Sequence, residues 1–401
     1  MPNKTTDGSA QTLARKKTVN INLKDFGMVF ALIAVYVIFA LLTGGKNTSP
    51  ANINNLVMQN SYVVILAVGM LLCVLTGNVD LGVGSIVALC GAVSGVLMVD
   101  YHMPIPVAIL AALAVGLVCG MFAAFFIANL GIPPFVVTLG TMLMGRGLTY
   151  MLLKSQTKGP LSTTYNFIGA GYLPTVKVDF MGGQLDLLCV IVAAVVTVLL
   201  VLNEMKNYRS QRHYGFATNP LWQLAVKDGV ILFIVWFFFM KLGRYNGIPF
   251  VLVIMAVLVG IYHFITTRTV AGRQIYALGG NRKAAQLSGI NTNKVFFWVY
   301  TNMGLLCGLA GVVLSARNGS ATPKAGDAFE MDAIASCYIG GAAVAGGAGS
   351  IIGAVVGALL MGVLNNGMSL FGWDTPVQKV VKGAVLLLAV TLDLVSKRKK
   401  S

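Results

Sequence analysis

Charged residues are scarce in this chain. Only 10% of its 401 residues are Asp, Glu, Lys or Arg, whereas 57% are hydrophobic and the mean hydropathy is +0.80. A soluble domain of this composition would expose more apolar surface than water tolerates, which excludes a soluble protein. The length instead fits one bundle of about 10–12 membrane-spanning helices, because each span needs roughly 20 apolar residues.

The regular alternation of apolar and polar residues that is typical of a membrane β-barrel is also missing. The apolar runs are longer than barrel strands, and a helix in lipid satisfies its own backbone hydrogen bonds. The sequence therefore predicts an all-α fold, a polytopic transmembrane helical bundle.

Signatures of catalysis are lacking as well. The chain contains no GxxxxGK[ST] sequence, so it does not bind ATP phosphates as a P-loop protein does. No Ser/His/Asp arrangement, carboxylate pair or His-rich cluster stands out, and the six Cys residues lie in apolar segments without a CxxC pair. We expect no catalytic residue, no metal site and no cofactor in this chain, which is therefore not an enzyme.

Twelve apolar segments are present, and ten crossings is the alternative count because some segments are short or could be re-entrant. They lie at Phe26–Thr43, Leu56–Thr76, Leu81–Val99, Ile105–Asn129, Pro133–Leu153, Leu185–Leu202, Val230–Met240, Ile248–Thr266, Val295–Leu314, Met331–Ala345, Ile351–Phe371 and Val377–Val395. The segment at 230–240 is short for a span, and we expect its helix to begin upstream, near Leu221. The predicted membrane domain covers residues 26–395.

Basic residues indicate the orientation. Four polar segments, 1–25, 203–228, 267–294 and 396–401, hold 18 of the 29 Lys and Arg residues, which predicts that these segments and both termini are cytoplasmic. Residues 1–25 have no short apolar region with a cleavage site and are interpreted as a tail. The net charge of +16 does not indicate nucleic-acid binding, since no aromatic stripe accompanies the basic residues. The predicted location is the inner (plasma) membrane of a bacterium, with multiple crossings.

The longest outer connection, residues 154–184, shows little apolar periodicity. It is either a solvated loop or a landing surface for an external partner. Within the apolar body the ionisable residues are essentially Asp80 and Arg146, and an intramembrane charge is by default a functional hypothesis. Asp80 precedes a Gly-rich helix start and is well placed to cap it, while Arg146 could pair with Asp80 or with backbone carbonyls.

The segment 267–294 has five basic residues and no carboxylate. We interpret Gly279-Gly280-Asn281 as a tight turn, Asn281 as the N-cap of a short helix over Arg282–Leu287, and Ser288-Gly289 as its end. A short helix on a basic loop suits insertion into a groove of a partner. The predicted coupling residues are Gly279, Gly280, Asn281, Ala284, Ala285, Ser288, Gly289 and Ile290.

Four blocks resemble the permeases of ribose/xylose-type (multiple-monosaccharide) importers of the ATP-binding-cassette class. They are AGRQIYALGGNRKAAQLSGI at 271–290, DLGVGS at 80–85, GIPPFVVTLGTMLMGRGL at 131–148, and GGAAVAGGAGSIIGAVVGALL at 340–360 followed by Asn365-Asn366-Gly367. Gly82 stands where the family often has Ser. The apolar hairpin near 203–247 is more similar to the xylose and multiple-monosaccharide members.

The resemblance implies a division of labour. A separate cytoplasmic ATPase would bind ATP and Mg, an external binding protein would deliver the sugar, and a second permease copy would complete the pathway in the lipid bilayer. Candidate pathway residues are Asn60, Asn78, Asp80, Thr141, Arg146 and Asn365. A related importer for branched-chain amino acids or nucleosides, and a proton- or sodium-coupled secondary transporter, are the alternatives.

Overall fold

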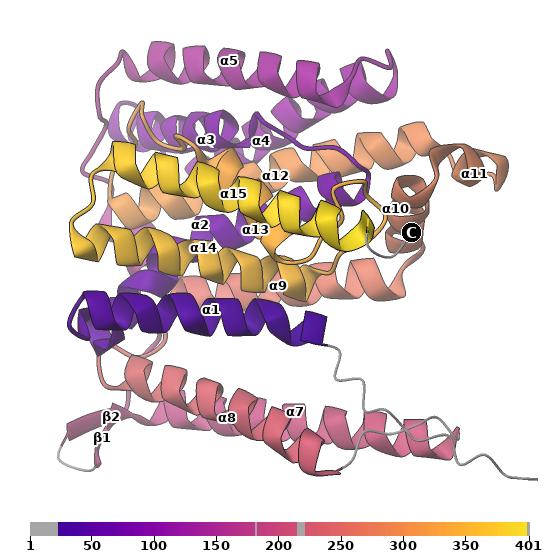
Figure 1. Ribbon diagram of the computed structural model, residues 1–401. Helices are drawn as coiled ribbons and strands as arrows, with labels where there is room; N and C mark the ends of the chain where they lie inside the picture. The colour runs from indigo at the N-terminus through magenta and orange to yellow at the C-terminus, as the bar shows by residue number, and fades with distance from the viewer. Residues whose placement is uncertain (1–22, 181–182, 215–220, 399–401) are drawn as a thin grey trace, which may run out of the picture.

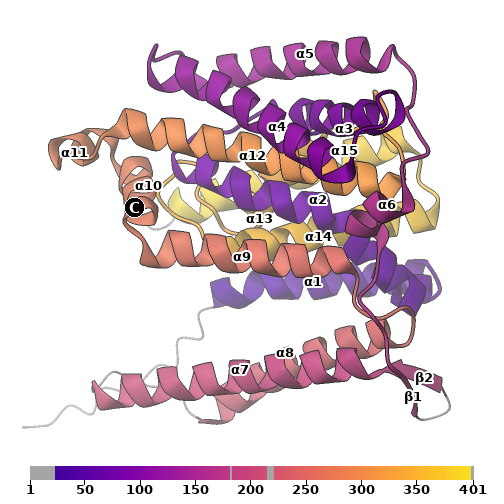
Figure 2. The same ribbon diagram turned by 180° about the vertical axis from the view of Figure 1, so that it is seen from behind.

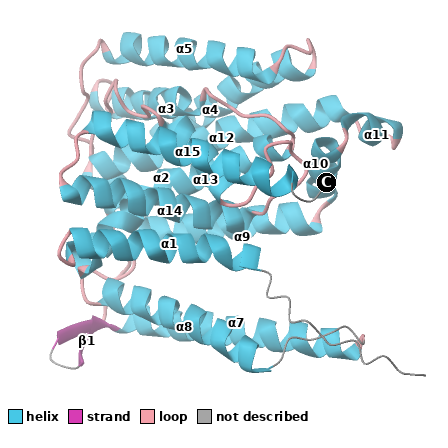
Figure 3. Ribbon diagram, in the orientation of Figure 1, coloured by secondary structure: helices cyan, strands magenta, loops and turns pink. Residues whose placement is uncertain are grey.

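The computed structural model describes residues 23–180, 183–214 and 221–398. Its elements in chain order are α1 (Leu23–Leu42), the 3₁₀ helix η1 (Lys46–Thr48), α2 (Pro50–Leu75), α3 (Val83–Val99), α4 (Ile105–Ala128), α5 (Pro134–Leu153), α6 (Thr163–Ala170), β1 (Lys177–Phe180), β2 (Gly183–Asp186), α7 (Leu187–His213), α8 (Leu221–Gly243), α9 (Phe250–Arg268), α10 (Val270–Gly280), α11 (Arg282–Leu287), α12 (Thr292–Asn318), α13 (Phe329–Ile339), α14 (Ile351–Phe371) and α15 (Thr375–Arg398). Over these ranges the one β-sheet is the small antiparallel hairpin β1–β2 (Figure 3), and the all-α prediction is confirmed.

Each of the twelve predicted apolar segments overlaps one helix: α1 to α5, α7 to α9 and α12 to α15. Seven described helices are long and apolar enough to cross a membrane, namely α2, α4, α5, α7, α9, α12 and α14. A polytopic membrane bundle is therefore confirmed, whereas a total of ten to twelve crossings stays a prediction. The described part of α8 begins at Leu221, so this helix extends upstream of the short apolar segment 230–240, as predicted.

Helix α2 forms the centre of the bundle. Its most apolar window is 94% buried, whereas the corresponding window of α7 is 11% buried. The hydrophobic surface of α2 is covered on all sides by α12, α14, α13 and α9, so an apolar helix without a polar face is stable here. Helices α5, α7 and α8 lie at the periphery and leave wide apolar surfaces exposed (Figure 1).

Small residues allow the inner helices to approach closely. A Cβ added at Gly116 of α4 would lie 2.4 Å from the carbonyl oxygen of Gly304 in α12, and one at Gly357 of α14 would lie 2.0 Å from that of Ser336. Such contacts let dispersion attraction act between backbones, which is how helices associate in lipid. The small residues of α4 and α14 thus form packing surfaces.

The connection 154–184 is partly folded into the bundle. Tyr165 of α6 is fully buried, and its hydroxyl donates to Oγ of Ser94 at 3.0 Å and lies 2.8 Å from Oγ of Ser315. The interpretation of this whole connection as a solvated loop is therefore wrong for α6. Contact of its remaining surface with an external partner stays a prediction.

The described ends of the chain, at the start of α1 and the end of α15, lie at the same end of the bundle as α10 and α11 (Figure 1). Helix α1 begins at Leu23, inside the predicted tail 1–25, and residues 1–22 lie outside the described ranges. Residues 396–398 belong to α15 and 399–401 are not described. We call the end with α10 and α11 the coupling end and the end with α6 and β1–β2 the opposite end.

Candidate functional site

Two crossings of the bundle are interrupted. After α2 ends at Leu75, residues 76–82 are irregular and lead into α3; we call 76–99 the first broken crossing. After α12, residues 319–328 are irregular and lead into α13; we call 319–339 the second broken crossing. Irregular backbone at membrane depth is tolerated only where protein buries it or where it lines a cavity, so both segments need local partners.

The second broken crossing spans the bundle and is not re-entrant. At the opposite end, the Gly319 carbonyl accepts from Leu161 N at 2.9 Å. At the coupling end, Gly347 N donates to the Leu75 carbonyl at 2.9 Å. The chain therefore leaves α12 at the opposite end and reaches residue 347, just before α14, at the coupling end. The segment between these two helices must cross the bundle.

The two broken crossings touch where their helices begin. A Cβ on Gly84 would lie 2.2 Å from the Gly326 carbonyl oxygen, and one on Gly326 would lie 2.0 Å from the Gly84 oxygen. Gly326 also has φ +70, which favours glycine. We call this contact the junction. From it α3 runs to the opposite end and α13 to the coupling end, so two helix N-termini meet inside the bundle (Figure 1).

Asp80 and Thr141 lie at the junction. Asp80 is 4% exposed, and its carboxylate accepts a hydrogen bond from Gly82 N at 2.8 Å. Gly82 is itself the N-cap of α3, and no side chain caps this helix, so Asp80 stabilises the turn before α3 and does not cap the helix as one alternative predicted. A Cβ on Gly82 would lie 2.6 Å from Thr141 Oγ1. Gly at position 82, where related permeases often have Ser, therefore fits a tight contact with α5.

Arg146 of α5 stabilises the second broken crossing and not Asp80. Its Nη1 donates to the carbonyls of Pro323 and Ala325 at 2.9 and 2.6 Å. Of the two predicted partners, the backbone carbonyls are the observed one. A guanidinium donates well to such orphan carbonyls because it is planar and permanently charged.

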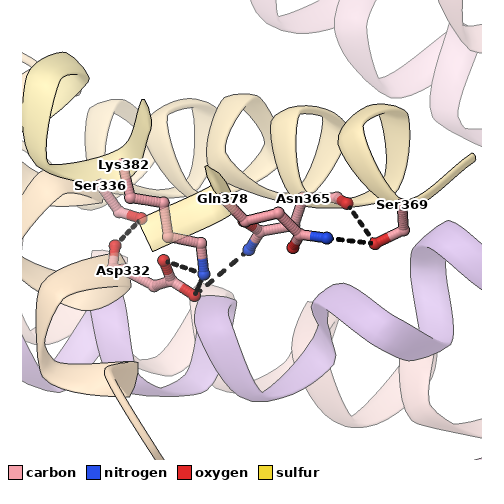
Figure 4. A network of polar contacts seen from close by, with 6 residues as sticks. All are labelled: Asp332, Ser336, Asn365, Ser369, Gln378 and Lys382. Atoms are coloured by element: carbon pink, nitrogen blue, oxygen red, sulfur yellow. Dashed lines mark hydrogen bonds and ion pairs between the residues drawn. The ribbon is translucent and has the colours of Figure 1, made fainter. Parts of the chain in front are cut away.

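A buried ion pair that the sequence analysis missed fixes α13 to α15. The Asp332 carboxylate is fully buried and lies 2.9 and 3.0 Å from Lys382 Nζ, while Asn365 Nδ2 donates to it at 3.2 Å (Figure 4). Ser369 Oγ donates to the Asn365 carbonyl and accepts from Gln378. The restriction of intramembrane charges to Asp80 and Arg146 was therefore wrong. The available signal was Asp332 inside the apolar segment 331–345.

The remaining pathway candidates lie apart from the junction. Asn60 Nδ2 donates to the Ala358 carbonyl at 3.0 Å, where α2 packs on α14. Asn78 Nδ2 donates to the Thr76 carbonyl at 3.1 Å within the first irregular segment. Asp80, Thr141 and Arg146 thus gather around the broken crossings, Asn365 joins them through Asp332, and Asn60 does not. Over the described ranges no group of three or more His, Cys, Asp or Glu residues could hold a metal ion.

Helix α11 occupies the predicted residues Arg282–Leu287. Asn281 Oδ1 accepts from Ala284 N at 3.0 Å, and Gly289 with φ +82 follows the C-cap Ser288, so the predicted cap and helix end are confirmed. Gly279-Gly280 is not a separate turn, because it forms the last residues of α10. Ala285 is the buried residue of α11, while Leu287 is 90% exposed.

Helix α10 connects this exposed helix to both broken crossings. A Cβ on Gly279 would lie 1.7 Å from the Leu75 carbonyl oxygen, directly before the first broken crossing. Tyr276 Oη donates to the Gly349 carbonyl at 2.8 Å, in the connection after the second one. A displacement of α11 would therefore reach both broken crossings through these two contacts of α10.

Comparison with known proteins agrees with this architecture. Residues 52–390 match the family described as "Branched-chain amino acid transport system / permease component". The xylose transport system permease protein XylH of Haemophilus influenzae is 37% identical over 96% of this chain and 99% of its own length. The Escherichia coli K12 counterpart is 37% identical over 95% and 94%, and the ribose import permease protein RbsC of that strain is 34% identical over 90% and 92%. No solved structure matches the chain.

Proposed function

Because this chain belongs to the family of branched-chain-amino-acid-type transport permease components, we propose that it is the permease subunit of an ATP-driven monosaccharide importer. The transported sugar is xylose or a related monosaccharide, since relatives named for xylose and ribose transport are similar over nearly the whole chain. The subunit is a multi-pass protein of the bacterial inner membrane.

The proposed mechanism rests on one observation, the exposed helix α11 at the coupling end. Leu287 is 90% exposed beside basic residues, which is costly for a free apolar side chain and suits a hydrophobic socket on another protein. The partner is a cytoplasmic ATPase that binds ATP and Mg, since this chain has no P-loop. This assignment places the coupling end and both termini in the cytoplasm.

Movement of α11 drives the transport step. Closure of two ATPases displaces α11 and α10, and the contacts of Gly279 with Leu75 and of Tyr276 with Gly349 pass the displacement to the broken crossings. Interrupted helices are typical of transporter sites because their ends can move as rigid pieces. Asp80, Thr141 and Arg146 form the part of the pathway that changes shape, with a second copy of this chain completing it.

An external sugar-binding protein delivers the substrate at the opposite end. The surface around α6 and β1–β2 is the part of the permease that faces it in this orientation (Figure 1). This partner, the second permease copy and the surrounding lipid are the components that the proposal requires, and nucleic acid is not among them.

The proposal is tested by reconstituting the chain with the ATPase and binding protein encoded beside it. We expect ATP-dependent uptake of xylose or another monosaccharide from a panel of pentoses and hexoses. Uptake of leucine or a nucleoside instead would favour the related importers that share this family. Uptake that persists without ATP under a proton or sodium gradient would favour a secondary transporter, although Asp332 is paired with Lys382 and Asp80 accepts a hydrogen bond from Gly82 N.

A further inference from the structure

An apolar groove of about 300 Å³ opens on the outer surface of the bundle beside α9 and α12. Its lining is entirely aliphatic: Val253, Ile254, Val257, Leu258, Ile261 and Leu309. Figure 2 shows α9 and α12 at this surface with part of α2 visible between them. The Tyr262 hydroxyl donates to the Asn302 amide oxygen and so bridges the two helices at one end of the groove.

The hydrogen bond between Tyr262 and Asn302 places these two residues at the same height in the bundle, so the positions of other residues along α9 and α12 can be measured from it. On α12, Lys294, Trp298, Asn302 and Leu309 follow one another at helical spacing and share a face. Since Asn302 contacts α9, this face is turned toward α9. Leu309 then lies about 10 Å from the bridge on the groove side, and Lys294 lies about 12 Å away on the coupling side.

Helix α9 has the same arrangement, with apolar residues at the groove and a basic residue toward the coupling end. Ile254, Ile261 and Arg268 are seven residues apart and lie on one face. Arg268 lies about 9 Å from the level of Tyr262 toward the coupling end. Two exposed basic residues, one from each helix, therefore stand at the same end of one apolar groove.

Charge complementarity identifies the occupant. The segment 267–294 has no carboxylate, so Arg268 and Lys294 have no acidic neighbour within it. Trp298, which is 37% exposed, has the amphipathic ring that favours the headgroup level of a bilayer. Basic pockets between helices on the cytoplasmic side bind anionic headgroups, and acyl chains fill aliphatic grooves.

We propose that this groove binds one anionic phospholipid. Its acyl chain lies against Ile254, Ile261 and Leu309, and its phosphate lies between Arg268 and Lys294. Because Arg268 and Lys294 flank the segment that carries α10 and α11, the bound headgroup lies beside these two helices at the coupling end. The site does not depend on which substrate the protein transports.

The test is native mass spectrometry of the purified full-length chain titrated with phosphatidylglycerol or phosphatidylcholine. We expect preferential retention of phosphatidylglycerol. The double variant Arg268→Gln/Lys294→Gln should weaken that binding about 30-fold, and each single variant about 5-fold, if each basic residue contributes as at a membrane surface. The charge-keeping variant Arg268→Lys/Lys294→Arg should retain it, which separates loss of charge from misfolding.

Matched controls come from α7, whose exposed basic residues lie at the same end of the bundle. Lys206→Gln/Arg209→Gln should leave phosphatidylglycerol binding unchanged. Ile261→Trp should fill the groove and lower binding, whereas Leu199→Trp on the exposed face of α7 should not. Equal binding of the two lipids, or equal effects of the two double Gln variants, would overturn the proposal. A change of oligomeric state with Ile261→Trp would assign the groove to a second copy of this chain.

Discussion

The two broken crossings are held in place by different kinds of contact. In the first, the side-chain hydrogen bond is local, because Asp80 accepts from the N–H of Gly82, two residues away, in the turn before α3. In the second, the supporting groups come from distant elements, Arg146 of α5 and Lys382 of α15. The polar contact of the first interruption is therefore made within its own sequence, whereas the polar contacts of the second exist only in the assembled bundle.

The largest effect is expected at the second broken crossing. Lys382→Met leaves the Asp332 carboxylate buried without its cation, which should lower the free energy of unfolding by about 3–5 kcal/mol. Thermal and chemical unfolding of the purified chain in detergent measures this loss. Adding Asp332→Asn to Lys382→Met should recover part of it, because the uncompensated charge is then removed.

The matched control for that variant is Lys379→Met, one turn earlier on α15. Lys379 pairs with Asp327 at 2.7 Å, but both side chains are at least half exposed, at 50% and 64%. Solvent screening limits such a pair to less than about 1 kcal/mol. If the two Lys variants lose equal amounts of unfolding free energy, the burial of Asp332 does not make its ion pair with Lys382 more stabilising than the exposed Lys379–Asp327 pair.

The next largest effect is expected at the junction. Gly84→Ala would drive a methyl group into the Gly326 carbonyl and to 2.6 Å from Glu330 Oε2, and because the Gly326 carbonyl is backbone that cannot rotate away, the cost should approach about 3 kcal/mol. Gly91→Ala on the same helix meets its nearest atom at 3.3 Å and should cost much less. The same unfolding measurement compares them, and a tolerated Gly84→Ala would mean that the crossings are not in contact.

The smallest effect is expected at the locally held crossing. Asp80→Ala removes the hydrogen bond from Gly82 N and should cost about 1 kcal/mol. Asp80→Asn keeps an acceptor oxygen and should restore most of that loss, as measured by unfolding midpoints. A loss comparable to that of Lys382→Met, without rescue by Asn, would mean that the charge of Asp80 has a role beyond this one hydrogen bond.

The contrast between local and long-range contacts also explains which features could be predicted from the sequence. Helix α11 has the predicted residues because its cap Asn281 and its terminal Gly289 act over only a few positions. The extension of α8 upstream of residue 230 and the hydrogen bond of Asp80 with Gly82 depend on equally local features. Long apolar runs predicted the membrane bundle, since lipid leaves few alternatives to helices.

Contacts between distant segments were not predictable in this way. Asp332 and Lys382 are 50 residues apart, and only folding shows that α15 delivers a cation to α13. The burial of Tyr165 and the choice of backbone carbonyls by Arg146 also depend on neighbouring helices. The close packing of Gly279 against Leu75 at the end of α10 is likewise a long-range contact, which the Gly-Gly-Asn turn pattern does not reveal.

ATP-dependent xylose uptake with the variant Leu287→Ser tests the coupling role of α11 most directly. Leu287 contributes nothing to the core at 90% exposure, so the variant should fold normally yet lose most uptake and ATPase binding. Leu130→Ser, which changes another exposed apolar residue after α4, serves as the control and should transport normally. Full ATP-driven uptake by Leu287→Ser would contradict the account, because the exposed helix would then not be where the ATPase acts.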